Sequence, residues 1–310
     1  MILTVSPNPC VDKTLFTGPI QLGTKIRAPR FTCIAGGKGC NVSRAIKALG
    51  GDTAAMVLVG GPTGRHVIDM LEQQDGVPTV PVWVDGLTRT ITTVLEEPLH
   101  RQTAFFEPGP LTTEMERARF LELFRDAVTR AKLVTLNGSA PDPALDGLYR
   151  DLLDIAHDCG VPVILDAYGA IFNEALVGRP FMVKPNAEEL EQCLGTSLDT
   201  RKKQWEAVEA LRCRGVELVV LSLGEEGALV ASNEGCVHAR PPEIKEVNPV
   251  GSGDALVAGF ALGLAQGMDL METIRLGIAM GTANAMSWDI GSFTREQVEA
   301  LSPQVRITPR

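Results

Sequence analysis

The stretch Asn248-Pro-Val-Gly-Ser-Gly-Asp254 runs directly into the apolar segment Ala255-Leu-Val-Ala-Gly-Phe-Ala-Leu-Gly-Leu264. Gly251 and Gly253 permit a tight turn with unusual dihedral angles, and the apolar segment predicts a buried helix. The unpaired N–H groups at the start of that helix, together with its dipole, favour a phosphate or the charge that develops when one is transferred. Asp254 would lie where it could take a proton from an attacking hydroxyl. An ordinary helix-capping Asp is the alternative.

A second glycine cluster, Ala35-Gly-Gly-Lys-Gly-Cys-Asn41, also precedes a helical pattern and has a lysine in its turn. The helix is predicted from apolar residues three and four positions apart and would stop at Gly50-Gly51. The cluster is not a Walker A loop, because Lys38 is followed by Gly39 rather than by Ser or Thr. The later cluster is not a convincing dinucleotide fingerprint either, because Leu256 stands where the third glycine belongs.

Composition limits the partners that the chain can bind. At 310 residues it could form one large domain or two ordinary ones, and its formal net charge is −9. A surface for nucleic acid or anionic membrane needs clustered Lys and Arg, so neither partner is expected and an anionic ligand must meet a local basic pocket.

No apolar run reaches the length of a membrane span and the N-terminus does not resemble a signal peptide, which predicts a cytoplasmic location. The seven scattered cysteines predict reduced thiols.

Strand-like apolar runs alternate with helical patterns, which predicts an α/β fold with a mostly parallel sheet flanked by helices. The runs lie at residues 54–59, 133–136, 161–165, 181–183 and 216–221, with helical patterns between them such as 145–156 and 205–211. Residues 12–34 and 79–107 break this rhythm with alternating polar residues and predict short antiparallel strands. We expect them to form one small sheet that projects from a single domain of residues 1–310. Edge strands of the main sheet are the alternative.

Together the two glycine clusters resemble the two signatures of the PfkB, or ribokinase-like, family of sugar kinases. Gly36-Gly37-Lys38-Gly39-x-Asn41 resembles the first signature and Val250-Gly-Ser-Gly-Asp254 the second, and the resemblance covers nearly the whole chain. Three further stretches resemble the branch that acts on phosphorylated ketohexoses: Val5-Ser-Pro-Asn-Pro-Cys-Val-Asp12, Thr24-Lys-Ile-Arg27 and Asn248-Pro-Val. The resemblance implies a ribokinase-like fold, ATP and Mg²⁺ as cofactors, and fructose 1-phosphate as the substrate that becomes a bisphosphate. Tagatose 6-phosphate and fructose 6-phosphate are the alternative substrates.

The resemblance also assigns roles around the sugar. Asp254 resembles the catalytic base, and the amides of Gly251, Ser252, Gly253 and Asp254 would stabilise the transferring phosphoryl group. The residues implied around the sugar phosphate are Asp12, Lys25, Arg27, Gly36, Gly37, Lys38, Asn41, Arg89 and Ser139. The four cations among them would form a pocket for the phosphate that the acceptor already carries. The chain departs from the family at Ser252, where Ala is usual, and at Ile91, where Asn is common.

On the nucleotide side, the resemblance implies Lys184, Asn186, Ser222, Gly224, Glu225, Gly227 and Asn284. Lys184 would reach the nucleotide phosphates, and Asn284 matches a residue that is usually near the adenine. Asn186 and Glu189 match the family's Asn-x-x-Glu motif, which holds Mg²⁺ largely through water. An ordinary helix start with an acidic first turn is the alternative for this motif.

Several of these residues have structural alternatives. Lys25 and Arg27 could be solvated strand residues, Asp12 a turn cap, and Ser139 part of a turn at a strand end. The four histidines have no partner spacing and are expected to be structural or exposed: His66, His100, His157 and His238. In the family the small sheet is a lid over the sugar and commonly a dimer contact, so a homodimer through it is expected. A sugar-binding regulator without turnover and a nicotinamide-dependent dehydrogenase are the alternative functions.

Overall fold

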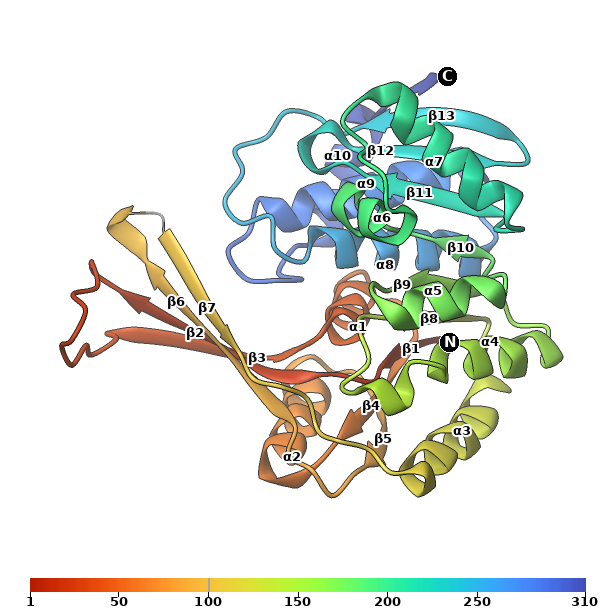
Figure 1. The fold of residues 1–310 in the computed structure, drawn as a ribbon. Coiled ribbons are helices and arrows are strands. Elements are labelled where there is room, and N and C mark those ends of the chain that lie inside the picture. The colour runs from red at the N-terminus through yellow and green to blue at the C-terminus, as the bar shows by residue number, and fades with distance from the viewer. Residues whose placement is uncertain (100) are drawn as a thin grey trace.

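Figure 1 shows the computed structural model, which describes residues 1–99 and 101–310 as a large sheet between helices, with a smaller sheet that projects to one side. Within these residues the large sheet has ten strands in the order β14-β13-β12-β11-β10-β9-β8-β1-β4-β5. The pairs from β5 to β11 are parallel and those from β11 to β14 are antiparallel. The predicted α/β fold with a mostly parallel sheet is confirmed.

The strands of the large sheet contain the apolar runs of the sequence. They are β1 (Ile2–Ser6), β4 (Thr53–Val59), β5 (Thr79–Trp83), β8 (Leu133–Asn137), β9 (Val163–Asp166), β10 (Met182–Val183), β11 (Leu218–Ser222), β12 (Ala228–Ser232), β13 (Gly235–Arg240) and β14 (Arg306–Pro309). Strands β1 and β4 are buried along their whole length, because both faces of a parallel sheet are covered. Strands β9 to β11 begin one or two residues later than the sequence predicts.

Helices cover both faces of the large sheet and enclose three apolar cores. They are α1 (Lys38–Ala48), α2 (Gly61–Asp69), α3 (Glu114–Val128), α4 (Leu148–Asp158), α5 (Ala170–Val177), α6 (Ala187–Leu194), α7 (Arg201–Cys213), α8 (Ser252–Gln266), α9 (Leu270–Ala285) and α10 (Arg295–Leu301). One core lies under α3 to α7, the second lies under α1 and α8 to α10, and a smaller third one lies between α2 and β4. The helix predicted at 145–156 begins later, at Leu148, because a 3₁₀ turn at Pro143–Leu145 precedes it.

The smaller sheet, here called the lid sheet, consists of β2 (Cys10–Thr17), β3 (Arg30–Gly36), β6 (Arg89–Glu96) and β7 (Arg101–Phe106), in the order β3-β2-β6-β7. It projects from the rest of the molecule in Figure 1, as expected. Two details of the prediction are wrong. The central pair β2 and β6 is parallel, since both strands leave the main body in the same direction. Thr79–Trp83 belongs to the large sheet, where it pairs with β4.

The cysteines and histidines of the described residues have no catalytic grouping. All seven cysteines are free thiols. The His238 ring lies 2.8 Å from the carbonyl oxygen of Glu226, and His66 lies 3.7 Å from the Cys33 sulfur. His157 is in the last turn of α4, and His100 lies outside the described residues. No helix in the described part of the chain has the length and apolar character to cross a membrane.

The sequence motifs meet at one edge of the large sheet. Parallel strands end there: β9 at Asp166, β10 just before Lys184, and β11 at Ser222. Helices α1 and α8, which follow the two glycine clusters, pack against each other and against β1. Ligands of open α/β sheets bind at this carboxyl edge, so the fold brings the predicted site residues to a suitable place.

Candidate active site

The N-terminus of α8 is built as the sequence predicts, with one correction. Gly251 precedes the helix with φ 81°, and a Cβ there would lie 2.5 Å from Ile290, so this position requires glycine. Gly253 does not take an unusual dihedral angle, because it already lies in the first helical turn. A Cβ at this position would make only an ordinary van der Waals contact of 3.5 Å with the Lys184 Nζ, so the ammonium group lies close to this turn. Asp254 is the third helical residue, so the capping alternative for it is wrong.

The second glycine cluster opens α1 in the same way. Gly37 precedes the helix with φ 107°, and a Cβ there would lie 3.1 Å from both the Ser6 Oγ and the Pro9 Cα. The turn therefore packs directly on the chain that leaves β1. One helical turn further, the Asn41 Nδ2 donates a hydrogen bond of 2.8 Å to the Asp254 carboxylate. The two clusters thus form one site.

A buried carboxylate that the sequence did not single out links the cations of this site. Asp166 is fully buried at the end of β9, and its Oδ1 lies 3.0 Å from the Lys38 Nζ and 3.2 Å from the Lys184 Nζ. Lys38 also contacts the Glu189 Oε1 at 3.0 Å. Lys38 is therefore held by two carboxylates. The sequence feature that could have identified Asp166 is an apolar strand that ends in an acidic residue.

Burial and these charges shift the pKa values of Asp254 and Asp166 in opposite directions. Burial raises the pKa of Asp254 to about 6, and the nearby Asp166 charge adds to this, although Lys38, the Asn41 hydrogen bond and Lys184 oppose it. Burial also acts to raise the pKa of Asp166, but Lys184 and Lys38 outweigh it and the pKa is lowered. Asp254 can therefore exchange a proton near neutral pH, while Asp166 stays ionised as a counter-ion.

A second group of polar side chains lies where the lid sheet meets the large sheet. The Arg89 Nη2 donates to the Asn8 carbonyl oxygen at 3.1 Å, and its buried Nε has no hydrogen-bond partner among the described residues. The Ser139 Oγ lies 3.5 Å from the Asn8 Nδ2 and accepts from the Tyr168 hydroxyl at 3.3 Å. Asn8 and Tyr168 were not predicted. Asn8 lies in the quoted segment 5–12, and Tyr168 follows Asp166 by two residues.

Asp12 faces the main body, whereas Lys25 and Arg27 do not. Asp12 lines a cavity of about 70 Å³ with Asn248 and Trp288, and burial raises its pKa against the influence of Arg44 and Arg89. Lys25 and Arg27 lie in the exposed loop between β2 and β3, at the outer end of the lid sheet in Figure 1. The predicted pocket of four cations is not assembled within one chain, because the two strands carry this loop away from the carboxyl edge.

On the nucleotide side, the Asn-x-x-Glu motif forms an ordinary helix start and also turns one carboxylate oxygen towards the candidate site. The Asn186 Oδ1 accepts from the Glu189 N–H at 2.7 Å, and the Glu189 Oε2 accepts from the Asn186 N–H at 3.0 Å, which is a helix capping box. The Glu189 Oε1 remains turned towards Lys38. Ser222 pairs with Asn186 across neighbouring strand ends, and the turn Gly224–Glu226, with Glu225 in it, leads to Gly227.

The site suits a hydrated Mg²⁺ better than a metal held directly by protein. Within the described residues no cluster of three or more His, Cys, Asp or Glu side chains could hold a metal ion. The Asp166 Oδ2 is buried without a hydrogen-bond partner there, and Glu189 offers a second carboxylate across Lys38. Mg²⁺ keeps several waters and needs few protein oxygens, so these donors fit it.

Asn284 holds the glycine turn of α8 in place. Its Nδ2 donates to the Val250 carbonyl oxygen at 2.8 Å and to the Ser252 Oγ at 3.2 Å, and its Oδ1 accepts from the Gly291 N–H at 2.9 Å. The amide is buried and fully used by these bonds. An adenine contact for this residue stays a prediction.

Comparison with known proteins agrees with this geometry. The pfkB family carbohydrate kinases match residues 7–287. The chain belongs to this family. Like its relatives, it is a phosphotransferase that acts on a sugar hydroxyl, and the dehydrogenase alternative is wrong. Kinases of the family use ATP with a divalent metal.

Three curated relatives act on different phosphosugars. The chain is 34% identical to the ATP-dependent 6-phosphofructokinase isozyme 2 of Mycobacterium tuberculosis over 96% of this chain and 88% of the relative. It is 33% identical to the 1-phosphofructokinase of Bacillus subtilis and 31% identical to the tagatose-6-phosphate kinase of Staphylococcus epidermidis, over 99% of each chain. The protein is therefore a phosphosugar kinase.

Solved structures of phosphofructokinase-2 from Escherichia coli have the same fold. Its tetrameric inhibited form has a TM-score of 0.90 at 30% identity, and its complex with fructose-6-phosphate has a TM-score of 0.89 at 28% identity. Each comparison covers 98% of both chains. The predicted ribokinase-like fold is confirmed over nearly the whole length.

Proposed function

We propose that the protein transfers the γ-phosphoryl group of ATP to fructose 1-phosphate and forms fructose 1,6-bisphosphate. The observation that carries the proposal is the 2.8 Å hydrogen bond between Asn41 and Asp254, which joins both glycine turns in one buried site. The names of the relatives support a phosphorylated ketohexose as the acceptor. Tagatose 6-phosphate and fructose 6-phosphate are the competing substrates.

In this proposal Asp254 accepts the proton of the attacking hydroxyl. Phosphoryl transfer needs positioning and charge stabilisation more than covalent help from the protein. The amides of Gly251, Gly253 and Asp254 and the Lys184 ammonium group, close to Gly253, would stabilise the transferring group, while the Ser252 N–H already donates to the Pro249 carbonyl oxygen at 3.1 Å. Glu189 and Asn186 would hold Mg²⁺ through water, and the ion would supply positive charge beside the phosphates of ATP. A cytoplasmic location is part of the proposal, since ATP is the donor.

The phosphate that the acceptor already carries would meet Arg89 and Ser139, with Asp12 and Asn41 on the sugar hydroxyls. The unpartnered Arg89 Nε supports this, because a buried guanidinium donor needs an acceptor. Lys38 would exchange one of its carboxylates for a phosphate oxygen. The lid sheet, formed by β2, β3, β6 and β7, would close over the sugar and exclude water.

We also propose a homodimer through the lid sheet. Strand pairing places Phe31 and Phe105 on one face of the sheet, and each side chain is 62% exposed. Asp12 lies on the opposite face. A second copy that covers the two phenylalanines could bring its own loop 18–29 to the site, which would return Lys25 and Arg27 to the role expected of them.

A coupled assay of ADP release with a panel of sugars tests the proposed function. The panel contains fructose 1-phosphate, fructose 6-phosphate, tagatose 6-phosphate, fructose and ribose. The three phosphorylated ketohexoses should give far higher kcat/KM than fructose and ribose, because cationic side chains gain little from a neutral sugar, and fructose 1-phosphate is expected to be the best of the three. Equal efficiency on ribose would refute a phosphosugar acceptor, and sugar binding without ADP release would favour a silent regulator.

A further inference from the structure

We propose that Arg44 and Asp75 are positioning residues that fix the Asn41 amide with its N–H group towards Asp254. The hydrogen bonds of Arg44 and Asp75 are observed in the structure, while their effect on turnover rests on the proposed role of Asp254 as the base. Both residues lie outside the two glycine clusters and are not among the residues proposed to bind a ligand. Arg44 lies one turn after Asn41 on α1, and Asp75 follows a π-helical turn at Met70–Gln74.

The Arg44 guanidinium makes four hydrogen bonds to three residues. Its Nη1 donates to the Asn41 Oδ1 at 3.0 Å, and its Nη2 donates to the Ala35 carbonyl oxygen at 2.8 Å. Its Nε and Nη2 donate to the two oxygens of Asp75 at 2.9 and 2.8 Å. A continuous row of charge-assisted hydrogen bonds therefore runs from Asp75 through Arg44 and Asn41 to Asp254.

The direction of the Asn41 amide is the feature that this row controls. The two ends of an asparagine side chain have almost the same shape, so hydrogen bonds decide which end faces which neighbour. Arg44 can only donate and therefore holds the Asn41 oxygen, which leaves the amide N–H group for Asp254. Without Arg44 the amide loses one of the two contacts that fix it, so its N–H group is held less firmly towards the Asp254 carboxylate.

The chemistry of the pair explains why these residue types are needed. A guanidinium offers a rigid fork that can hold a carboxylate with two donors while another donor reaches Asn41, whereas a lysine ammonium cannot do both in fixed geometry. Asp75 thus sets the plane of the Arg44 group. The stem of Arg44 is also confined, since a Cβ on Gly291 would lie 2.9 Å from its Cδ.

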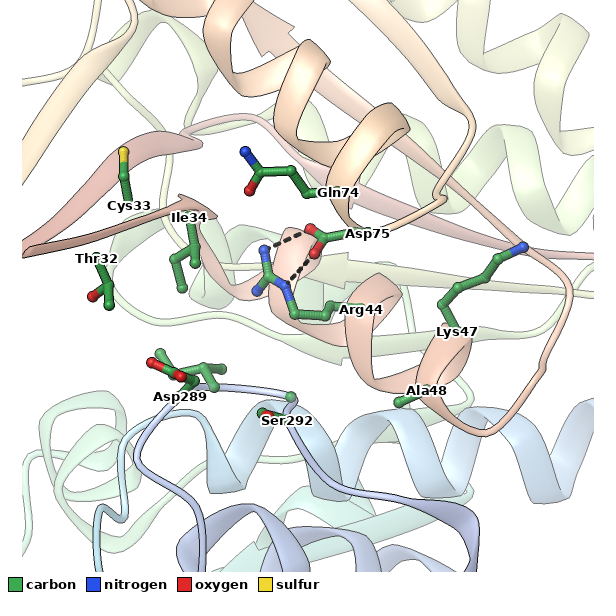
Figure 2. A pocket seen from close by; sticks show the side chains of 12 residues that line it. Thr32, Cys33, Ile34, Arg44, Lys47, Ala48, Gln74, Asp75, Asp289 and Ser292 are labelled. Atoms are coloured by element: carbon green, nitrogen blue, oxygen red, sulfur yellow. Dashed lines mark hydrogen bonds and ion pairs between the residues drawn. The ribbon is translucent and has the colours of Figure 1, made fainter.

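The Arg44 and Asp75 pair can be altered without entering the sugar and nucleotide sites. Figure 2 shows the pair in the wall of a cavity of about 520 Å³, with Cys33, Lys47 and Asp289 around it. Neither Asp254 nor Lys184 lines this cavity. Substitutions of Arg44 and Asp75 therefore leave Asp254 and Lys184 in place, although Arg44→Met also removes a charge that acts on Asp12, which Arg44→Lys retains.

The pH dependence of activity provides a readout that a purely structural role would not change. The charged groups that act on the Asp254 carboxylate are Asp166 from β9, Lys38 from α1 and Lys184 after β10, and the Asp254 charge in turn acts on the Cys40 thiol of α1. The Asn41 hydrogen bond opposes the rise in the pKa of Asp254 that burial causes. Loss of that bond should raise the pKa further, so the acid limb of kcat/KM should move to higher pH.

The experiment compares Arg44→Met, Arg44→Lys, Asp75→Asn and the double variant Arg44→Met/Asp75→Asn with the wild type. Arg44→Met should lower kcat/KM by about 10- to 100-fold, as expected when a support of a reacting group is lost. Arg44→Lys keeps the charge but not the fork and should show most of the loss, and Asp75→Asn should show less. The double variant should be no worse than Arg44→Met, because the residues act in series.

Arg117→Met is the matched control, because Arg117 pairs with Asp151 between α3 and α4 without contact to the site. It should leave both kcat/KM and the acid limb unchanged. Thermal unfolding identifies any variant that does not fold, in which case Arg44→Lys and Asp75→Asn decide. An unchanged acid limb in folded Arg44→Lys and Asp75→Asn would overturn the inference.

A direct titration separates this inference from the proposed function. If the wild type phosphorylates no sugar of the panel, the proposed function fails. The pKa of Asp254, followed by carbon NMR of labelled aspartate without ligands and assigned with Asp254→Asn, then tests the row alone. It should be higher in Arg44→Lys than in the wild type, and equal values would overturn the inference.

Discussion

Asn41 donates a hydrogen bond of 2.8 Å to Asp254, although 213 positions separate the two residues. Each lies in the first turns of a helix that a glycine turn opens. The bond therefore fixes the two helix N-termini, α1 and α8, relative to each other. An acceptor sugar bound by Asn41 would be held within reach of the proposed base, which is the positioning that phosphoryl transfer requires.

Gly251 should be far more sensitive to substitution than its neighbour Ser252. A side chain at residue 251 would lie 2.5 Å from Ile290 and adopt φ 81°, so Gly251→Ala should lower stability by about 1–3 kcal/mol and reduce turnover. Ser252→Ala removes one hydrogen bond from Asn284, should change stability by less than about 1 kcal/mol and should keep activity. Urea unfolding and kcat measure both. Equal effects would contradict a role for the left-handed turn.

Arg89 should contribute to affinity for the sugar phosphate rather than to affinity for ATP. Arg89→Met should raise KM for the phosphorylated sugar by about 10- to 100-fold, the worth of one or two charge-assisted hydrogen bonds. The KM for ATP should stay the same. Arg101→Met is the control on the same sheet, since Arg101 pairs with Glu96. If Arg89→Met leaves the sugar KM unchanged, the phosphate lies elsewhere.

The exposed phenylalanines of the lid sheet should hold two copies together. Phe31→Asp/Phe105→Asp should shift the protein from dimer to monomer in analytical ultracentrifugation, because it adds charge to an apolar contact. Val177→Asp is the control, as Val177 is an equally exposed apolar residue (65%) on α5. A wild type that is already monomeric at assay concentration would refute the dimer and leave Lys25 and Arg27 without a route to the site.

The local parts of the site could be predicted from the sequence. Glycine turns that open apolar helices are short-range patterns, so the starts of α1 and α8 and the place of Asp254 after one of them follow from neighbouring residues. The pattern does not determine each dihedral angle, and the expectation for Gly253 was wrong for that reason. The residues 79–83 were assigned to the lid because their pairing with β4 is not visible in their own composition.

Long-range contacts could not be predicted in the same way. Asp166 enters the site because β9 lies between β8 and β10, and this order is a property of the whole sheet. Asp75 supports Arg44 because the chain after α2 returns to the side of α1 that carries Arg44 and Lys47. The loop with Lys25 and Arg27 was assigned correctly to the lid segments, but its distance from the site depends on the length of β2 and β3.

The pH dependence should reflect the raised pKa of Asp254. A base must be unprotonated to accept a proton, so kcat/KM for the sugar phosphate should fall as the pH decreases through about 6, where burial places this pKa. An ordinary aspartate would remain ionised and active well below that pH. The rate should be measured between pH 4.5 and 8 at saturating ATP. A flat profile down to pH 5 would contradict the raised pKa.

The turnover of Asp254→Asn, measured beside its affinity for ATP, tests the central claim most directly. If Asp254 takes the hydroxyl proton, kcat should fall by about 10²- to 10⁴-fold while ATP binding stays near normal. Asp269→Asn is the matched control, since Asp269 only caps α9 and asparagine caps a helix equally well. Near-native turnover of Asp254→Asn would contradict the account and remove Asp254 from the role of base.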